Sequence, residues 1–398
     1  MKKIAIVVQR CHKDVVGGSE SEAWHYANLL KEYFEVHILT TTAIDTDKWS
    51  NTLSEGDEFK DGIRIKRFRV SQGRADYWLE IYGRLVNEFE NLKLNRPDLK
   101  VDERLIRWPV ALQEEFIYKQ GPYSSSLMDF LTKGSNNYKA VIFFTYLYPT
   151  TYFGIYNTPK KKILFVPTLH NEAPAYLSVY KYMARRARSI LWNTKAEFKF
   201  GISLWGKLPG SVVGVDVKTE QFAPVDPGFP YLLYCGRIDV NKGCPQLVDY
   251  FLRYKKDHPS DLRLVFTGSD GIGLPSDTNI LFKGFVSETE KLKLMSGASI
   301  FVMPSPNESF SIVTLEAMAQ KTPILASDGS EVIIDHIKKS GGGLLYNDYD
   351  SFKYGINFLL ENKQKAKDMG EKGRKYVVKN YNDEKIFKKL KDKIESFD

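Results

Sequence analysis

The chain has 398 residues, more than a single core of ordinary size can organise, so we expect at least two domains. Its composition, 43% apolar and 27% charged, is typical of a globular protein and argues against a disordered chain. The net charge of +8 is compatible with nucleic acid, an anionic membrane surface or an anionic substrate as partner. The basic residues are scattered and form no nucleic-acid motif, so nucleic acid is the least expected of these partners.

Cys11, Cys235 and Cys244 form no Cys-x-x-Cys pair. Their odd number argues against a disulfide framework or a zinc site and favours a reducing compartment. The apolar run at the start of the chain stops at Gln9, too early for a signal peptide. Residues 140–159 lack charge but are rich in tyrosine and threonine, which favours a buried strand, a loop and a helix over a membrane span. We therefore expect a cytoplasmic protein.

The first half of the chain alternates short apolar strands with helical patterns, which is typical of a mostly parallel sheet with crossover helices. Charged and aromatic helical segments interrupt this alternation at about 71–137, and we interpret them as an insertion in the first domain. The expected strands are 3–8, 36–40, 63–69, 140–144, 162–166 and 190–192.

A segment rich in proline and glycine, at about 213–228, is predicted to link two domains. A second alternation follows it, with strands expected at 231–234, 262–267, 280–283, 299–303, 323–326 and 343–345. The last stretch is rich in lysine and glutamate and strongly helical. The predicted division is a first domain at 1–214, a second at 215–384 and a final helix at 385–398.

Gly17 and Gly18 come soon after the first expected strand. Ligands of open α/β sheets bind beyond the carboxyl ends of the strands, and glycine lets the backbone approach a phosphate closely. The alternative is a tight turn that needs a positive φ angle. The pattern is not Gly-x-Gly-x-x-Gly, so a dinucleotide site is disfavoured.

Arg237 and Lys242 follow the first strand of the second alternation, with Gly236 and Gly243 beside them. Fixed cations in such a loop would stabilise the negative charge of a departing diphosphate without a metal ion. The alternative is a pair of solvated surface charges.

Glu308 and Glu316 stand eight positions apart, a rise of about 12 Å along a helix, so one carboxylate can precede a helix and the other lie inside it on roughly the same side. The N–H groups of the first turn between them would accept an anion. The helix dipole alone would explain Glu308 but not Glu316, which lies two turns in among small apolar residues. Two carboxylates around an anion site suit a nucleotide-sugar.

Three motifs together resemble the donor site of retaining glycosyltransferases of the GT4 family. They are Glu308-x7-Glu316 with Ala317-Met318-Ala319, Gly236-Arg237-x4-Lys242-Gly243, and Gly17-Gly18-Ser19-Glu20. The resemblance implies the GT-B fold, an α/β architecture of two Rossmann-like domains facing across a cleft, with the last helix crossing back to the first domain. It also implies metal-independent transfer of a hexose from a nucleotide diphosphate sugar to a glycan or lipid-linked acceptor, as in the synthesis of cell-surface polysaccharide or glycoconjugates.

The same resemblance assigns roles to individual residues. Glu308 would contact hydroxyls of the donor sugar, and Glu316 would hold the ribose. The N–H groups around Phe310, Ser311 and Ile312 would take the distal phosphate, with Ser311 standing where many relatives carry glycine.

Val286 belongs to Gly284-Phe285-Val286-Ser287, which resembles the loop whose backbone pairs with the nucleotide base. Ser287 is also expected to cap the helix that follows.

His170 follows the expected strand at 162–166 and therefore lies at a carboxyl end in the first domain. A lone histidine is more often structural, but the family tends to place a histidine or an acid near the reacting centre on this side. We therefore predict that His170 positions the acceptor or the sugar, and we count it with Glu308, Arg237 and Lys242 as catalytic.

Neither Asp-x-Asp match, at 45–47 and 348–350, is expected to hold a metal, because such short matches are frequent in solvated turns. We expect no metal and no cofactor. A basic and aromatic segment at 180–190 is either a solvated helix face or a contact for anionic lipid, which leaves peripheral membrane attachment open. The rival functions are a catalytically silent GT-B partner subunit, a phosphorylase, and a sugar-nucleotide epimerase of the same architecture.

Overall fold

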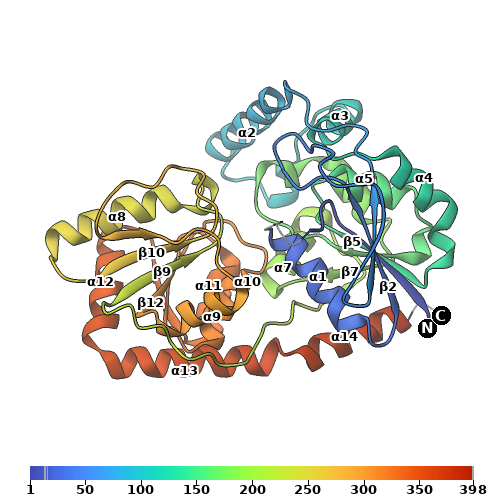
Figure 1. Ribbon diagram of the computed structural model, residues 1–398. Helices are drawn as coiled ribbons and strands as arrows, with labels where there is room; N and C mark the ends of the chain where they lie inside the picture. The colour runs from blue at the N-terminus through green and yellow to red at the C-terminus, as the bar shows by residue number, and fades with distance from the viewer. Residues whose placement is uncertain (13–14, 16, 397–398) are drawn as a thin grey trace. The chain divides into compact units, whose positions relative to one another are not determined.

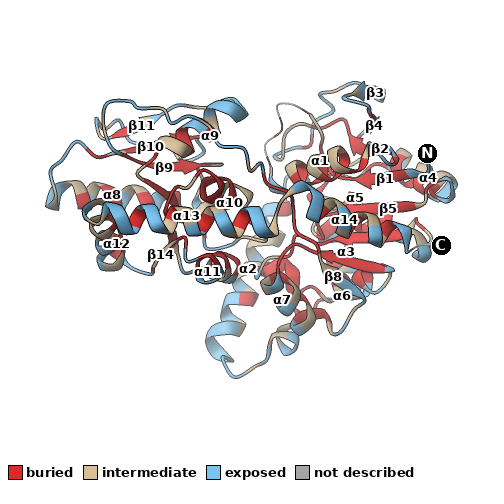
Figure 2. Ribbon diagram, turned by 90° about the horizontal axis from the view of Figure 1, so that it is seen from below, coloured by how far each residue is buried: buried red, intermediate tan, exposed pale blue. Residues whose placement is uncertain are grey.

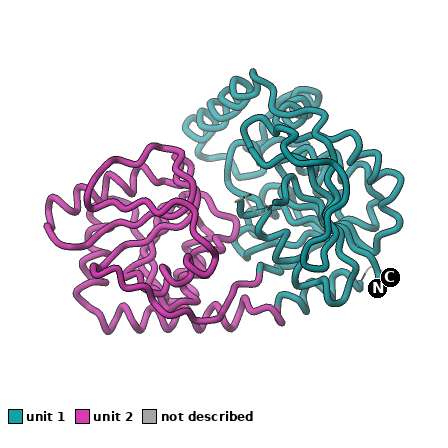
Figure 3. Tube along the Cα trace, viewed as in Figure 1, with its two compact units in different colours: residues 1–215, 386–398 teal, residues 216–385 magenta. Residues whose placement is uncertain are grey.

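A computed structural model describes residues 1–12, 15 and 17–396 of the chain. The chain forms two compact units, coloured separately in Figure 3. Unit 1 comprises Met1–Val215 together with the segment that begins at Ile386, and unit 2 comprises Asp216–Lys385. The prediction from the sequence placed these divisions after residues 214 and 384, and residues 397–398 of the predicted final helix lie outside the described residues.

Unit 1 is built on an eight-stranded sheet with the order β3-β4-β2-β1-β5-β6-β7-β8. Every pairing in it is parallel except that of the edge strand β3 with β4. The strands are β1 (Lys3–Val7), β2 (Glu35–Thr41), β3 (Gly56–Lys60), β4 (Ile63–Phe68), β5 (Ala140–Phe144), β6 (Ile163–Val166), β7 (Ser189–Trp192) and β8 (Gly210–Val212).

The six strands expected in this half are all present: most are short, buried apolar runs, whereas β4 contains three basic residues between its apolar ones. The sequence analysis missed β3 and β8. β3 is mostly exposed and carries charged residues, so it lacks an apolar signature. β8 has only three residues, which is too short for a periodic pattern.

The helices of unit 1 lie around this sheet, and not all of them contact a strand (Figure 1). They are α1 (Gly18–Leu30), α2 (Trp78–Asn95), α3 (Val110–Gln120), α4 (Ser125–Gly134), α5 (Pro149–Tyr156), α6 (Ser178–Ala184) and α7 (Lys195–Trp205), with short 3-10 turns η1 (Val101–Arg104), η2 (Ser135–Asn137), η3 (Lys160–Lys162) and η4 (Ala173–Tyr176). The elements from α2 to η2 lie within the range 71–137 in which the sequence analysis predicts an insertion.

The last helix, α14 (Asp383–Glu395), returns the chain to unit 1, as predicted. Its Phe387 ring lies 4.4 Å from the ring of Tyr33, and its Lys389 donates to the carbonyl of Val213 at 2.8 Å. The side chain of Arg188 donates to the carbonyl of Ser396 at 2.6 Å. One cation of the basic segment at 180–190 therefore serves to hold α14.

Unit 2 contains a six-stranded sheet with the order β11-β10-β9-β12-β13-β14, in which all described pairs are parallel. The strands are β9 (Tyr231–Cys235), β10 (Arg263–Thr267), β11 (Ile280–Phe282), β12 (Ile300–Met303), β13 (Ile324–Ser327) and β14 (Gly343–Tyr346). The helices are α8 (Cys244–Asp257), α9 (Glu288–Gly297), α10 (Ile312–Ala319), α11 (Glu331–Ser340), α12 (Tyr349–Glu361) and α13 (Lys363–Asn380), with the turn η5 (Val240–Lys242).

Relabelled in chain order, this strand order is 3-2-1-4-5-6, the doubly wound arrangement of Rossmann-like domains. The central strands are buried, whereas the outer faces of the helices are exposed (Figure 2). Among the described residues, no helix has both the length and the hydropathy required to cross a membrane.

Candidate active site

The order of the strands in unit 2 reverses between β9 and β12, which are parallel neighbours. Their carboxyl ends therefore lie side by side, and the loops that follow them diverge to opposite sides of the sheet. This divergence opens a crevice in which open α/β proteins bind ligands. The loop after β9 contains Arg237 and Lys242, and the loop after β12 contains Glu308, so the strand order brings these predicted residues together.

Lys242 and Glu308 form an ion pair, with Nζ 2.6 Å from Oε1. Their side chains are only 25% and 13% exposed. Gly243 permits this approach: it has a φ angle of +72°, and a Cβ there would lie 2.5 Å from the carbonyl oxygen of Pro304. The glycine beside Lys242 is thus required for the two loops to pack against each other.

Arg237 lies in the same loop as Lys242 but is 52% exposed on its side chain. The hydroxyl of Tyr234 donates to its carbonyl at 2.6 Å, which fixes the backbone, and its guanidinium lies 3.4 Å from a carboxylate oxygen of Asp239. Asp239 also accepts from the N–H of Lys242 at 2.9 Å. Both predicted cations are therefore presented by one ordered loop.

Helix α10 begins next to Glu308 without a side-chain cap among the described residues. Ser311, which precedes its first residue Ile312, has φ 62° and ψ 64°, the left-handed conformation that favours glycine. Its hydroxyl bonds to that of Thr314 at 2.9 Å instead of capping the backbone. The N–H of Thr314 donates to the carbonyl of Ser311 at 3.1 Å, but the first N–H groups of a helix generally have no acceptor within it, so this end suits an anion.

Glu316 lies inside α10 with its side chain 5% exposed. The structure supplies a counterion that the sequence analysis missed: Nζ of Lys291, on α9, is 2.7 Å from Oε2 of Glu316 and 2.9 Å from Oε2 of Glu288. Burial by itself lowers the pKa of Lys291, but the two carboxylates outweigh it and the pKa is raised. Glu316 is thus held in place as a buried carboxylate.

Phe310, in the same segment, is held by a buried aromatic cluster that the sequence analysis also missed. The Nε2 atom of His336 lies 3.0 Å from the carbonyl oxygen of Phe310, and its Nδ1 atom lies 3.0 Å from the hydroxyl of Tyr376. The ring of Tyr381 packs edge-on against Phe310 at 5.3 Å, and its hydroxyl bonds to that of Tyr376 at 3.1 Å.

The hydrogen bonds of His336 define its tautomer. A carbonyl oxygen can only accept, so Nε2 carries the proton and Nδ1 accepts from Tyr376 in the neutral ring. Burial lowers the pKa of His336 to about 4, which keeps the ring neutral at ordinary pH. Sequence analysis gave His336 no role, because its partners come from residues 26 and 40 positions away.

Val286 is half-buried in the loop between β11 and α9. Gly284 begins this loop with a φ angle of +65°, and its carbonyl accepts from the N–H of Gly268 at 2.9 Å. Ser287 caps α9, as predicted, by accepting from the N–H of Glu290 at 3.2 Å. Hydrogen bonds therefore hold this loop near both of its ends.

In unit 1, Gly17 precedes α1 and Gly18 is the first residue of that helix. The interpretation as a turn that needs a positive φ is wrong for Gly17, whose φ of −170° is ordinary extended backbone. A Cβ at Gly17 would instead lie 2.1 Å from a carboxylate oxygen of Glu20. That carboxylate pairs with the buried Arg10 at 2.7 Å, a contact that the sequence did not indicate.

His170 lies after β6, at the carboxyl end of the sheet of unit 1, and is half-buried. Its Nδ1 atom is 3.5 Å from Oε1 of Glu172, which also accepts from the hydroxyl of Tyr146 at 2.7 Å. Nearby, Thr145 and Thr168 have φ angles of 67° and 49°, and their hydroxyls bond at 3.2 Å. Branched residues in this conformation are strained, and such strain concentrates at functional sites.

Glu197 fixes the segment that carries His170. This buried carboxylate accepts from the N–H of Leu169 at 2.7 Å and from that of Asn193 at 2.5 Å. Burial raises the pKa of Glu197 to about 7, although these N–H groups act in the opposite direction.

The two Asp-x-Asp matches occupy turns. Asp45 accepts from the N–H groups of Lys48, Trp49 and Ser50, and Asp348 caps α12. Within 1–12, 15 and 17–396, no group of three histidine, cysteine or acidic side chains could hold a metal ion.

Unit 2 thus contains a Rossmann-like domain with a charged, structured crevice at its strand-order reversal. Comparison with known proteins identifies a family that this domain resembles. Residues 217–376 match the family described as "Glycosyl transferases group 1". Unit 2 is thus similar to group 1 glycosyltransferases over these residues, which are less than half of the chain, and the resemblance predicted from the sequence is confirmed to that extent.

Curated relatives match part of the chain. An uncharacterized glycosyltransferase of Methanocaldococcus jannaschii is 31% identical over 160 residues, 37% of this chain and 38% of the relative. A GDP-mannose-dependent alpha-(1-6)-phosphatidylinositol dimannoside mannosyltransferase of Mycobacterium tuberculosis is 28% identical over 167 residues, 37% of this chain and 42% of the relative. The matches span less than half of the length of either relative.

Solved structures match the whole chain in fold. Sucrose-phosphate synthase from Thermosynechococcus elongatus has a TM-score of 0.70 at 18% identity, covering 100% of this chain and 99% of that one. The Anabaena protein HepE, crystallised with UDP-glucose, has a TM-score of 0.69 at 13% identity, covering 100% of both chains. The fold is that of GT-B glycosyltransferases, as predicted.

Proposed function

We propose that the protein is a retaining, metal-independent glycosyltransferase that moves a hexose from a nucleotide diphosphate sugar to a glycan or lipid-linked acceptor. The observation that carries this proposal is the 2.6 Å contact between Lys242 and Glu308, placed beside the uncapped start of α10. The family match of unit 2 supports it, and so does the UDP-glucose named for a protein of the same fold.

The loops after β9 and β12 and helix α10 offer partners for the phosphate, the sugar and the ribose of such a donor. The start of α10 and Lys242 receive the distal phosphate, with Arg237 as a second cation. Glu308 faces the sugar hydroxyls, and Glu316, fixed by Lys291, receives the ribose. Because Lys242 and Glu308 form an ion pair, a donor would insert its phosphate and hydroxyl groups between the cation and the carboxylate.

The reaction proceeds on one face of the sugar. The bond between the anomeric carbon and the phosphate oxygen breaks, and the acceptor oxygen bonds to the same face of that carbon. The departing phosphate oxygen takes the proton of the acceptor hydroxyl, and the electron pair of the broken bond stays on the diphosphate. Arg237 and Lys242 stabilise the charge that develops there. We assign His170, with Glu172, to positioning the acceptor or the sugar.

The test is the thermal stability of the purified chain with UDP, GDP, ADP or dTDP, each with and without EDTA. Because a ligand that binds only the folded state stabilises it, saturation at a hundredfold excess over Kd contributes about 2.7 kcal/mol. We expect one nucleotide to raise the melting temperature by several degrees, equally with EDTA. If none does, the protein is better explained as a silent partner subunit.

Single substitutions test the role of individual residues with the same nucleotide shift. Lys242→Ala and Glu316→Ala should each abolish the nucleotide shift and strongly reduce turnover. Lys256→Ala, an exposed lysine on α8, and Asp45→Ala are the matched controls and should change neither. Normal turnover of Lys242→Ala would remove its phosphate role. Conversion of the donor without any acceptor would favour an epimerase.

A further inference from the structure

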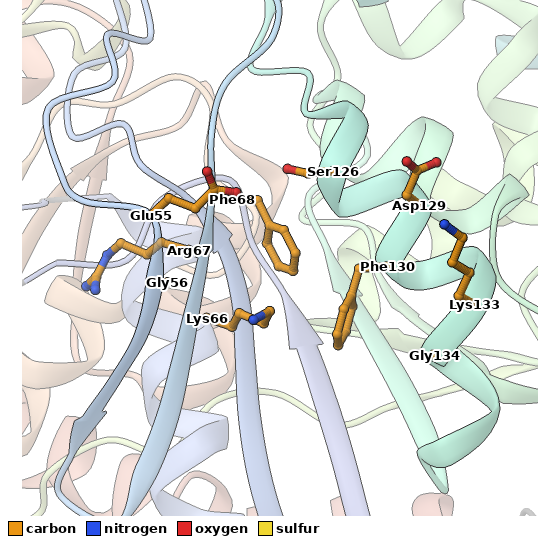
Figure 4. A pocket seen from close by; sticks show the side chains of 10 residues that line it. All are labelled: Glu55, Gly56, Lys66, Arg67, Phe68, Ser126, Asp129, Phe130, Lys133 and Gly134. Carbon is orange, nitrogen blue, oxygen red and sulfur yellow. The ribbon is translucent and has the colours of Figure 1, made fainter.

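A pocket of about 410 Å³ lies in unit 1, between β4 at the edge region of the sheet and helix α4. None of the residues predicted for the donor site lines it. In Figure 4 the rings of Phe68 and Phe130 point into this pocket from the strand and from the helix. Its volume falls in the range that small-molecule sites occupy, 300–1,000 Å³.

The wall of the pocket is aromatic. The rings of Phe68 and Phe130 lie 5.3 Å apart at an angle of 54°. The ammonium of Lys66 lies 5.7 Å from the first ring and 5.8 Å from the second, so it covers the apolar surface from one end. Gly134 lies beside the ring of Phe130, because a Cβ at this position would be 3.8 Å from the nearest ring atom. Since glycine has no side chain, it does not cover this part of the ring.

The rim of the pocket carries charges of both signs. Lys66 and Lys133 contribute ammonium groups, whereas Glu55 and Asp129 contribute carboxylates. Arg67 also lines the pocket, but its guanidinium pairs with the carboxylate of Glu58. A simple anion such as phosphate would be repelled by the two acids, and an aliphatic chain would leave the charges desolvated. A sugar ring meets both conditions: its C–H face packs on the ring of Phe130, since Phe68 is only 4% exposed, and its hydroxyls donate to carboxylates and accept from ammonium groups.

We propose that this pocket binds a sugar residue of the acceptor, at a distance from the reacting end. The inference rests on the proposed function and selects a glycan among the acceptor classes that it leaves open. Phe68 is the last residue of β4 and His170 follows β6, so both lie at the carboxyl ends of parallel strands in the same sheet. The strands from β4 to β6 are β4-β2-β1-β5-β6, a width of roughly 19 Å at about 4.8 Å per strand. An extended oligosaccharide spans that width, so the pocket would favour long acceptors.

Saturation-transfer NMR tests the proposal on the full chain with maltohexaose, a mannohexaose and a hyaluronan hexasaccharide as probes. We expect at least one of them to bind, and Phe130→Ala to weaken that binding about tenfold through the loss of the stacking surface. Phe59→Ala is the matched control, because Phe59 is 75% exposed on the neighbouring strand β3 and does not line the pocket. It should bind like the wild type.

A second variant guards against a folding defect of Phe130→Ala. Lys133 is exposed on α4, so Lys133→Ala should fold normally and still weaken glycan binding, whereas Lys161→Ala, exposed elsewhere in unit 1, should not. Binding of no probe, or equal binding by wild type, Phe130→Ala and Lys133→Ala, would overturn the proposal. The nucleotide shift, measured in the same samples, separates this failure from failure of the proposed donor site.

Discussion

His336 provides a direct test of how the segment at the start of α10 is held. Two substitutions separate its hydrogen bonds from its volume. His336→Gln retains an N–H donor for the carbonyl of Phe310 and cannot titrate, whereas His336→Phe fills the space but has no donor. Because a buried carbonyl that loses its donor costs about 1–3 kcal/mol, His336→Phe should be the less stable of the two by this amount.

The pKa of His336 adds a dependence on pH. Its ordinary value of 6.5 falls to about 4 in the folded chain, so the unfolded chain binds more protons between these values. The contribution of the neutral His336 ring to the free energy of unfolding is fully present above pH 6.5 and is lost as the pH falls through 4. The full shift corresponds to about 3 kcal/mol, of which about 2 kcal/mol should be lost between pH 7 and pH 4.5.

Urea unfolding of the wild type and both variants at pH 7 and pH 4.5 is the assay. All six tryptophans lie between residues 24 and 205, hence in unit 1, so their fluorescence reports that unit while far-UV circular dichroism reports both. Comparing variants with the wild type removes the contributions of other groups. We expect both variants to lack the loss of about 2 kcal/mol on acidification. The same acid loss in His336→Gln as in the wild type would refute the assignment.

Two further outcomes follow from the observed backbone and burial. At the left-handed position 311, Ser311→Gly should be more stable than Ser311→Ala by about 1 kcal/mol, and equal urea midpoints would contradict the strain. The pKa of Glu197 is raised, whereas that of His336 is lowered, so the two groups have opposite effects on the pH dependence of stability. The contribution of Glu197 to the free energy of unfolding is fully present below pH 4.5 and is lost as the pH rises through about 7. Glu197→Gln should therefore remove a loss of about 3 kcal/mol between pH 4.5 and pH 8, seen by tryptophan fluorescence, and an unchanged loss would contradict the burial of a titrating carboxyl.

The sequence was sufficient to predict the sheet of unit 2 and the loops that follow β9 and β12. Each strand there is a short apolar run, and Arg237, Lys242, Glu308 and Glu316 stand at fixed spacings from those runs. Strand order decides which loops become neighbours, and the parallel βαβ rule restricts that order to few arrangements. The positions of these residues could therefore be predicted from local patterns.

Partners that come from distant segments could not be predicted in this way. In the sequence, Lys291 cannot be distinguished from the other lysines of helical segments. Only the packing of α9 against α10 buries it beside Glu316. His336 has no neighbouring polar residue in the sequence that indicates Phe310 or Tyr376 as its partners. The pocket at Phe68 and Phe130 joins residues 62 positions apart, on a strand and on an inserted helix, and neither has a spacing that sets it apart from core residues.

The two units use the same topological feature with different chemistry. Unit 2 reverses its strand order between β9 and β12, where the loops present paired charges and the start of a helix, groups that suit a diphosphate. Unit 1 reverses its order between β1 and β5, where Thr145 adopts a strained conformation and bonds to the hydroxyl of Thr168. Hydroxyl groups without a neighbouring cation suit a neutral polyhydroxyl ligand better than paired charges do. This difference agrees with the glycan acceptor proposed above and does not depend on the pocket at Phe130.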